Sequence, residues 1–418
     1  MEEGIPKAPR VCMLLESYCP VVGGMETQAR NLSISLAAAG VPVLIVTRRS
    51  NPDLPETEVL DGIRVCRVPP TSHANRARWF TVATCLPTLI RRRRDYDIIL
   101  VPGFRALGIS AVIAGKFLGK RVVLKAENNG EMSGEFFEGG LKRMNLTRAS
   151  PAVRVFLALR NRLFVRADAF VSMSSKLTAE FVGQGVPPGR ITMIPQTVDV
   201  SRFHPVDAEQ KAAYRRELGL PADDLLAIYT GRLVSYKGVP LLLEAWENVC
   251  RTFKDAKLLV VGEGGVDIYN CEAELRNFVE SHHLQDNVMF TGARRNVDEY
   301  LKACDFLVFP TRNEAFGISL IEAMACGLPS ISTNEGGIRD ILDHERNGLM
   351  IEVGDSRQIE EAVVRMLRDP ALRRSLGEAA HRTVMERYTR QIVTRQYVDL
   401  FNACLARKPS ASPHQPRR

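Results

Sequence analysis

The chain has 418 residues, of which 45% are hydrophobic and 25% are charged, and its formal net charge is +8. This length accommodates roughly two or three domains with sizeable cores, and the composition is typical of a globular protein. The first ten residues lack the apolar stretch of a signal peptide, and no run reaches the ~18 apolar residues of a membrane span, so a cytoplasmic protein is expected. Nine scattered cysteines without a repeated CxxC spacing favour reduced thiols over disulfides or a zinc site.

Positive charge is concentrated in the first half of the chain. Residues 1–200 hold 27 Lys and Arg against 17 Asp and Glu, a net charge of +10, while residues 201–418 hold 29 against 31, a net charge of −2. Two basic stretches, RRRRDYD from Arg91 and VRVFLALRNRLFVR from Val153, predict peripheral contact with an anionic membrane surface at its inner face, or with an acidic acceptor. The helical spacing of the second stretch favours a plainer alternative, a buried apolar face and a solvated basic face. No nucleic-acid-binding motif accompanies the charge, so nucleic acid is not an expected partner.

Strand and helix patterns alternate along both halves, which is typical of parallel α/β layers. The expected strands are Val11–Leu15, Pro42–Thr47, Asp97–Val101, Arg121–Lys125 and Ala169–Ser172 in the first half, and the runs LLAIYT, KLLVVG, NVMFTG, DFLVFP and PSISTN in the second. The Gly- and Pro-rich stretch Gly183–Pro205 reads as the linker between the halves. The predicted fold class is α/β, with two Rossmann-like domains, 1–200 and 201–387, facing each other across a cleft.

Ligands of parallel sheets gather beyond the carboxyl ends of the strands, so the loops after the strands should hold the chemistry. After the first strand, Gly23 and Gly24 precede a helix, and such a backbone can cradle phosphate, although a tight turn explains the pair equally well. After LLAIYT, the loop GRLVSYKGV carries Arg232 and Lys237. Arginine offers a fixed fork and lysine a compact mobile charge, so together they suit a diphosphate. Plain solvation of two surface cations is the alternative.

The run EAFGISLIEAMACG, from Glu314 to Gly327, follows the strand DFLVFP and reads as a loop and then a helix. Glu314 then lies in the loop and Glu322 on the helix, with Gly317 near the helix start. Free N–H groups at a helix start form a site for an anion, and glycine allows a ligand to approach the backbone closely. The alternative is a buried helix with two surface carboxylates. A fourth loop, NEGGIRDIL from Asn334, repeats a Gly-Gly pair before a helix.

Taken in order, these motifs cover nearly the whole chain and resemble those of one enzyme family. They are PVVGGMET, IPQTVDVSRFHP, GRLVSYKG, VVGEG, VMFTG, EAFGISLIEAMACGLPSI and EGGIRDIL. The chain is similar to the family 4 retaining glycosyltransferases, or glycosyl transferases group 1, of GT-B architecture. The resemblance implies a hexosyltransferase that uses a nucleotide-diphosphate sugar as donor, needs no other cofactor, and acts in polysaccharide or glycolipid assembly on a glycan or lipid-linked acceptor.

The resemblance also implies a role for each of these positions. Glu314 would hydrogen-bond the sugar hydroxyls and Glu322 the ribose, while Arg232 and Lys237 would stabilise the departing diphosphate. Backbone N–H groups near Phe316, Gly317 and Ile318, together with the Gly23 and Gly24 loop of the first domain, would bind the diphosphate, and the base would lie near Gly262 and the segment from Thr291 to Arg294.

Family membership further implies retention of configuration at the anomeric carbon. Retention normally uses a carboxylate nucleophile, but none is evident in the sequence, so attack from the leaving-group face with the departing phosphate as base is expected. The DYD run at Asp95 to Asp97 reads as a turn, and His282 and His283 lack carboxylate or cysteine partners at ligand spacing. Transfer is therefore expected to need no metal.

The stretch VVLKAENNGEMSG departs from the family pattern. Many members carry a histidine near the donor sugar in this region, whereas this chain has Lys125, Glu127 and Asn128. Glu127 is therefore a candidate contact for the sugar or the acceptor, with a local cap or ion pair as the alternative. The resemblance also predicts that a C-terminal helix, 388–407, packs back on the first, acceptor-binding domain, and the polar tail 408–418 is expected to be disordered.

Other functions compete with this interpretation. A dehydrogenase would need a GxGxxG run after the first strand, which the sequence lacks. A nucleotide-sugar epimerase of GT-B fold and a non-catalytic sugar-nucleotide-binding protein share the two-domain frame. Turnover of the donor would exclude the non-catalytic binding protein, and an epimerised nucleotide sugar would identify the epimerase.

Overall fold

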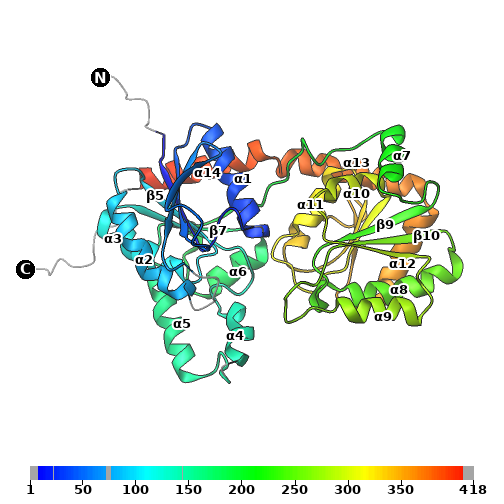
Figure 1. Ribbon diagram of the computed structural model, residues 1–418, viewed down its shortest axis with the longest axis horizontal. Coiled ribbons are helices and arrows are strands. Elements are labelled where there is room, and N and C mark those ends of the chain that lie inside the picture. The colour runs from blue at the N-terminus through cyan, green and yellow to red at the C-terminus, as the bar shows by residue number, and fades with distance from the viewer. Residues whose placement is uncertain (1–7, 22, 72–76, 144, 408–418) are drawn as a thin grey trace, which may run out of the picture. The chain divides into compact units, whose positions relative to one another are not determined.

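The computed structural model describes residues 8–21, 23–71, 77–143 and 145–407. It divides into two compact units, through which the chain can be traced in Figure 1, where colour follows residue number. Unit one runs to Ile194 and includes the chain from Val393 onward, and unit two is Pro195–Ile392. The boundaries expected from the sequence were 200/201 and 387/388. The predicted tail, 408–418, lies outside the described residues.

An eight-stranded sheet forms the centre of unit one, in the order β3-β4-β2-β1-β5-β6-β7-β8. Its strands are β1 (Val11–Leu15), β2 (Val43–Arg48), β3 (Thr57–Leu60), β4 (Ile63–Val68), β5 (Ile98–Pro102), β6 (Arg121–Lys125), β7 (Ala169–Ser172) and β8 (Ile191–Met193). All neighbours pair in parallel except β3, which runs antiparallel to β4. The five strands expected in this half are confirmed.

Three strands of unit one were not anticipated. The edge strand β3 is half exposed, and β4 carries Arg64 and Arg67 among its apolar residues, so neither has the apolar run of a central strand. The third, β8, lies inside Gly183–Pro205, so the expectation that this whole stretch is a linker is wrong. Three residues of it pair with β7 and extend the sheet.

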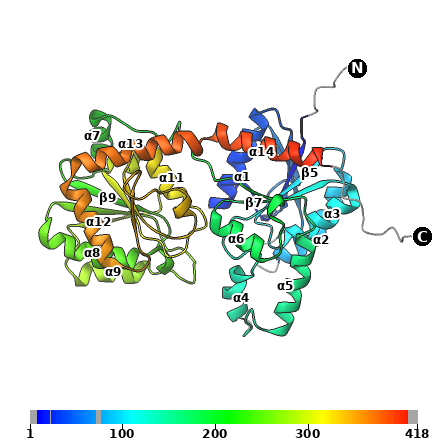
Figure 2. The same cartoon turned by 180° about the vertical axis from the view of Figure 1, so that it is seen from behind.

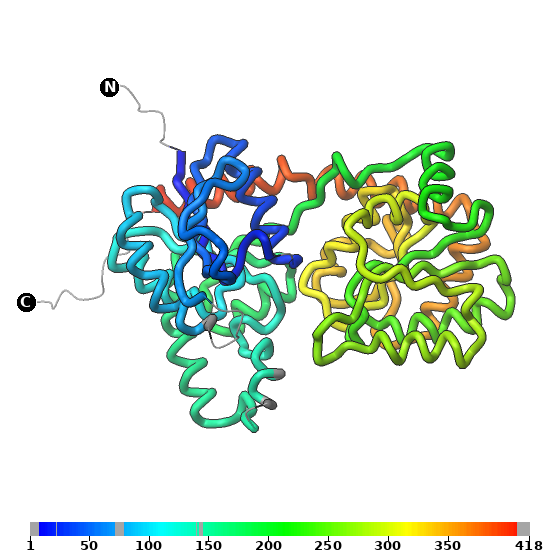
Figure 3. Tube along the Cα trace, in the orientation of Figure 1, coloured from blue at the N-terminus to red at the C-terminus, as the bar shows by residue number. Residues whose placement is uncertain are grey.

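Helices cover both faces of this sheet. They are α1 (Gly24–Ala38), α2 (Ala77–Arg91), α3 (Leu107–Leu118), α4 (Glu138–Arg143), α5 (Pro151–Phe164), α6 (Ser175–Gly183) and, from Val393 onward, α14 (Arg390–Ala406), with the short turns η1 (Glu135–Phe137) and η2 (Pro188–Arg190). The core beneath α1 and α14 joins their apolar residues to β1 and β2. Figure 3 shows the red C-terminal helix lying beside the blue N-terminal elements. Helices α2 and α3 pack on the sheet elsewhere, and α3 also contacts α5.

Helix α5 matches the expected orientation only in part. Phe164 is buried and Arg154 and Arg162 are exposed, as expected, but the helix also buries Arg160 and Asn161 and exposes Val155 and Leu159. Burial of Arg160 is tolerated because its guanidinium donates to the backbone oxygens of Glu131 at 3.0 Å and Met132 at 2.8 Å. Burial lowers the pKa of Arg160 to about 10, against the raising effect of Glu131 and Glu180.

Unit two is built on a six-stranded, all-parallel sheet in the order β11-β10-β9-β12-β13-β14. Its strands are β9 (Leu225–Thr230), β10 (Ala256–Val261), β11 (Val288–Gly292), β12 (Phe306–Phe309), β13 (Ser330–Thr333) and β14 (Leu349–Ile351). The first five confirm the expected runs. The sixth has three residues, which is too short for a pattern in the sequence to reveal it.

The helices of unit two also form two layers. They are α7 (Ala208–Glu217), α8 (Val239–Thr252), α9 (Glu272–Ser281), α10 (Val297–Ala303), α11 (Ile318–Ala325), α12 (Ser356–Arg368) and α13 (Pro370–Arg387), with the turns η3 (Ser235–Lys237) and η4 (Gly336–Asp340). Figure 2 shows α8, α9 and α12 on one side of the sheet and α11 and α13 on the other, where Figure 1 also labels α10. Asp207, Asp355 and Asp369 cap α7, α12 and α13 through their side chains.

Each sheet reverses its direction of growth at one strand. In unit one, β1 lies between β2 and β5, and in unit two β9 lies between β10 and β12. Connections that leave such a strand on opposite sides open a crevice at its carboxyl end, where ligands of doubly wound sheets bind. The loops after β1 and β5, and after β9 and β12, are therefore the places to look for chemistry.

We expect Phe401→Ala in α14 to lower the free energy of unfolding of unit one by about 3–5 kcal/mol. Phe401 is fully buried in the core that includes Met13 of β1, so the truncation leaves a cavity there. Hydrogen exchange of β1 peptides during urea titration measures the effect. Leu405→Ala, at a partly exposed position of the same helix, is the control and should change stability by less than about 1 kcal/mol. Equal protection of β1 in both variants would contradict the role given to α14.

Candidate functional site

An ion pair occupies the reversal point of unit two. Lys237, at the end of η3 after β9, donates from Nζ to Oε2 of Glu314, which follows β12, at 2.7 Å. The two side chains are only 14% and 16% exposed, so water screens the pair weakly. Sequence analysis named both residues, but their contact across 77 positions could not be read from the sequence.

Glycines hold these loops in close backbone contact. Gly238, directly after Lys237, has φ 77°, and a Cβ there would lie 1.9 Å from the carbonyl oxygen of Pro310. Gly336 has φ 54°, and a Cβ there would lie 1.8 Å from the carbonyl oxygen of Glu314. Only glycine combines this left-handed backbone with so close an approach. The loop from Asn334 therefore packs directly against the loop that carries Glu314.

The Glu314 carboxylate also faces the start of α11. Its Oε1 accepts from the backbone N–H groups of Ala315 at 3.1 Å and Phe316 at 3.4 Å. The first bonds of the helix run from Leu320 and Ile321 to the oxygen of Gly317, which has φ 117°. The N–H of Ile318 therefore precedes the helical ladder, as the first N–H groups of any helix do. Phe316 itself is buried and meets Tyr388 edge to face at 5.8 Å.

Arg232 is held by neighbours that sequence analysis missed. Its side chain is 58% exposed and pairs with Asp267, and its guanidinium also donates to the hydroxyl of Tyr236. The Tyr236 ring lies 5.8 Å from the charged groups of both Arg232 and Lys237, so the ring brings the two cations to one place. No spacing rule points to Asp267, because it lies in the loop after β10, 35 residues from Arg232.

The positions expected near the base also meet. Gly262 follows β10 and donates its N–H to the oxygen of Gly292, at the end of β11, at 3.0 Å. A Cβ on Gly262 would lie 1.8 Å from the oxygen of Gly231, so the loops after β9 and β10 touch. Thr291 bonds to the neighbouring Gly292 oxygen, and Arg294 is exposed beyond it.

Glu322 lies on α11 as expected, and burial of its carboxyl disfavours the ionised form. Burial raises the pKa of its carboxyl to about 7, which Arg202 lowers and Asp298 raises. In the described part of the chain, no group bonds to this carboxyl. A carboxyl kept in such surroundings without a partner is a candidate for ligand contact.

In unit one, Gly23 and Gly24 stand at the start of α1. Gly23 caps the helix with an extended backbone, φ −163°, which any residue can adopt. A Cβ on Gly23 would lie 2.4 Å from the Glu26 carboxylate, which the hydroxyl of Ser17 also contacts. Because this carboxylate is the tip of a flexible side chain, neither the contact nor the backbone angle requires glycine at position 23.

The reversal point of unit one carries its own charged cluster, most of which sequence analysis missed. Arg105 after β5 lies 3.5 Å from Glu16 after β1, and both side chains are 8% exposed. Lys125, at the end of β6, pairs with Glu127, the residue that departs from the family pattern. Glu131 is fully buried and accepts from the N–H of Glu127 at 3.2 Å. Burial raises the pKa of the Glu131 carboxyl to about 7, which Arg105 lowers and Glu127 raises.

The described residues contain no group of three His, Cys, Asp or Glu side chains arranged to hold a metal ion. They also contain no helix with both the length and the apolar character needed to cross a membrane.

Family models match both halves of the chain. The model described as Glycosyltransferase Family 4 matches residues 22–202, and the model described as Glycosyl transferases group 1 matches residues 210–383. The chain belongs to the family 4 glycosyltransferases. The resemblance noted in the sequence is thereby confirmed, and the protein is an enzyme of this class.

Similar glycosyltransferases span the chain almost end to end. The N-acetyl-alpha-D-glucosaminyl L-malate synthase of Bacillus anthracis is 25% identical over 91% of this chain and 94% of its own length. The D-inositol 3-phosphate glycosyltransferase of Xylanimonas cellulosilytica is 25% identical over 97% of this chain and 99% of its own.

Solved structures confirm the GT-B fold. Sucrose-phosphate synthase from Thermosynechococcus elongatus matches with a TM-score of 0.75 and 23% identity, over 95% of this chain and 99% of that chain. Anabaena HepE in complex with UDP matches with a TM-score of 0.74 and 18% identity, over 94% of this chain and 100% of that chain.

We expect Glu322→Gln to raise the free energy of unfolding at pH 8 by up to about 3 kcal/mol, at 1.36 kcal/mol per pKa unit. The folded-state pKa lies above the usual value of 4.5, so the folded protein binds more protons and loses stability as the pH rises from about 4.5 to about 7. The variant should lack this slope in urea titrations from pH 5 to pH 8. Glu244→Gln, at an exposed position of α8, is the control and should behave as the unaltered protein. A Glu322→Gln protein with the unaltered pH slope would refute the assignment.

Proposed function

We propose that this glycosyltransferase moves a sugar, with retention of configuration, from a nucleotide-diphosphate sugar to a hydroxyl of a glycan or lipid-linked acceptor. The observation that carries the proposal is the weakly exposed Lys237 and Glu314 pair, at the reversal point of unit two and beside the start of α11. One cation, one acceptor and the exposed N–H groups of a helix start are the groups that a sugar diphosphate needs.

Glu314 and Lys237 contact different parts of the donor in this proposal. Glu314 accepts hydrogen bonds from the sugar hydroxyls, since an ionised carboxylate is only an acceptor. Lys237 turns toward the diphosphate, with the N–H groups of Gly317 and Ile318 on the same anion. Before the donor binds, each charge satisfies the other, so neither is buried alone. Arg232 adds a second cation, which Asp267 holds in place.

The reaction proposed for this site breaks one bond and forms one. The acceptor hydroxyl oxygen attacks the anomeric carbon from the face that the diphosphate leaves, while the bond from that carbon to the phosphate oxygen breaks. The hydroxyl proton passes to the departing phosphate oxygen. Lys237 stabilises the negative charge that develops on the leaving group, which is the largest electrostatic change in the reaction.

An anionic or lipid-linked acceptor is the class that we propose. The two relatives described above are named for malate and for inositol phosphate, both of which carry negative charge. The first 200 residues, which supply most of unit one, carry a net charge of +10 and would attract such an acceptor. A lipid-linked acceptor would also require peripheral contact with an anionic membrane from the cytoplasmic side.

We expect Lys237→Ala and Glu314→Gln each to lower kcat by on the order of a hundredfold or more. The first removes the charge that balances the leaving group, and the second removes a charged acceptor for the sugar hydroxyls. Release of nucleoside diphosphate from a panel of donor sugars, detected by mass, measures turnover. Lys254→Ala, an exposed lysine elsewhere in unit two, is the matched control and should retain full activity. Near-normal rates for both site variants would end the assignment.

Transfer is expected to continue at an unchanged rate after treatment with EDTA. The reason is that Lys237, Arg232 and the start of α11 supply the positive groups that a divalent ion would otherwise provide. The same donor assay measures the rate before and after chelation. Loss of turnover that Mn²⁺ restores would show that the cation pair does not suffice.

A further inference from the structure

Three neighbouring helices of unit one expose large apolar side chains. Eighteen large apolar side chains are exposed in the described part of the chain, and eight of them lie on α2, α3 and α5. They are Trp79, Phe80, Ile90, Ile113, Phe117, Val155, Phe156 and Leu159. Helix α3 contacts both α2 and α5, and the rings of Trp79 and Phe156 meet edge to face at 5.8 Å. We call these three helices the outer layer. Single exposed apolar residues are ordinary, but a run across adjoining helices marks an interaction surface.

Helix α5 shows that this exposure is not a by-product of a thin core. It places Arg160 and Asn161 inside the unit and leaves Val155 at 59% and Leu159 at 65% exposed. A helix that only covered the sheet would place these residues the other way round. The apolar side chains therefore face outward although buried positions exist on the same helix.

Charge on the outer layer has one sign. The sequences of α2, α3 and α5 contain no Asp or Glu, while Arg91, Lys116, Arg154 and Arg162 provide positive charge. Neither Arg154 nor Arg162 pairs with a carboxylate of the described chain. Exposed apolar and unpaired basic side chains on the same helices are the composition of surfaces that lie on anionic membranes.

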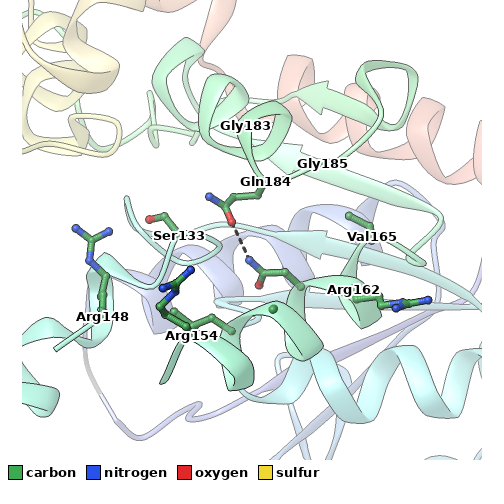
Figure 4. A pocket seen from close by; sticks show the side chains of 11 residues that line it. Ser133, Arg148, Arg154, Arg162, Val165, Gly183, Gln184 and Gly185 are labelled. Carbon is green, nitrogen blue, oxygen red and sulfur yellow. Dashed lines mark hydrogen bonds between the residues drawn. The ribbon is translucent and has the colours of Figure 1, made fainter. Parts of the chain in front are cut away.

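A pocket of about 540 Å³ adjoins α5 on its arginine side, lined by residues that include Arg148, Arg154, Arg162 and Gln184. Figure 4 shows Arg148 and Arg154 at one end of this pocket and Arg162 at the other. Glu138 pairs with Arg148 at 2.7 Å, so the uncompensated charges are those of Arg154 and Arg162. The floor is polar and satisfied, since Asn161 donates to Gln184 at 2.9 Å.

We propose that the outer layer docks on a membrane that contains anionic lipids. The exposed side chains of α2, α3 and α5 enter the headgroup region, and Arg154 and Arg162 bind lipid phosphates. Arginine suits this task because its guanidinium forms paired hydrogen bonds with phosphate oxygens while its stem lies along apolar surface. The inference rests on the proposed function in one respect, since a lipid-linked acceptor would be met at this surface.

Co-sedimentation of the full chain with vesicles tests the proposal. The protein should bind vesicles of phosphatidylcholine with about one-third phosphatidylglycerol, bind much less to phosphatidylcholine alone, and dissociate as salt is raised. The double change Arg154→Ser and Arg162→Ser should weaken binding by about fivefold per arginine. Leu159→Glu should weaken it by about tenfold or more, because it places a charge among the entering apolar groups.

Matched controls lie in unit two. Val266→Glu alters a fully exposed valine, and the double change Arg346→Ser and Arg357→Ser removes two exposed arginines. Both control proteins should bind vesicles as the unaltered protein does. All of the altered positions are exposed, so thermal unfolding should be nearly unchanged, and its measurement separates lost docking from lost folding.

Several outcomes would overturn the docking surface. They are no binding to anionic vesicles, equal binding to neutral and anionic vesicles, or outer-layer variants that bind as well as the controls. A dimer in solution that Leu159→Glu converts to a monomer, without vesicle binding, would identify the layer as an interface between copies. Release of nucleoside diphosphate from a soluble donor is measured in parallel. Vesicle binding without turnover of any donor would refute the proposed function and leave the docking surface standing, and turnover without vesicle binding would do the reverse.

Discussion

The meeting of opposite charges at the point where a parallel sheet reverses is the interaction on which the site depends. The chain passes from β9 to β10 on one side, and it returns later from β11 to place β12 on the other side, so the two connections diverge at the carboxyl end of β9. Charged side chains can stay in the crevice only if they are paired, since an isolated buried charge is costly. Lys237 and Glu314 satisfy that condition in unit two, as Glu16 and Arg105 do in unit one.

Backbone contacts then determine how closely a ligand can approach the pair. A Cβ at Gly238 or Gly336 would overlap a carbonyl oxygen of a neighbouring loop. The two glycines therefore allow the loops after β9, β12 and β13 to lie against one another. The carboxylate of Glu314 stays aimed at the start of α11 because two backbone N–H groups of its own loop bind it. Under the proposed function, a site built in this way is preorganised before the donor arrives, as electrostatic catalysis requires.

Unit one has an apolar core completed by α14 and, on α2, α3 and α5, apolar side chains that are exposed. Residues of α14 complete its core from the far end of the chain, so the two ends of the sequence stabilise one unit. On α5, Arg160 and Asn161 lie inside while Val155 and Leu159 lie outside, and the backbone oxygens of Glu131 and Met132 satisfy Arg160. The proposed docking surface depends on the outward-facing apolar side chains of α5. Its positive charge reflects the basic composition of this half of the chain.

The sequence alone predicted the fold class, the family and ten of the fourteen strands that the described residues form, because apolar runs, glycine positions and motif order are local properties of the chain. It also singled out Lys237, Glu314 and Glu322 as candidate site residues. It did not reveal the edge strands β3 and β8, the cluster of Glu16, Arg105 and Glu131, or the hold of Asp267 on Arg232. Which carboxylate meets which cation, and which face of α5 is buried, depends on contacts between residues far apart in the sequence. Only the tertiary structure decided those, since burial and pairing energies arise when the loops after separate strands come together.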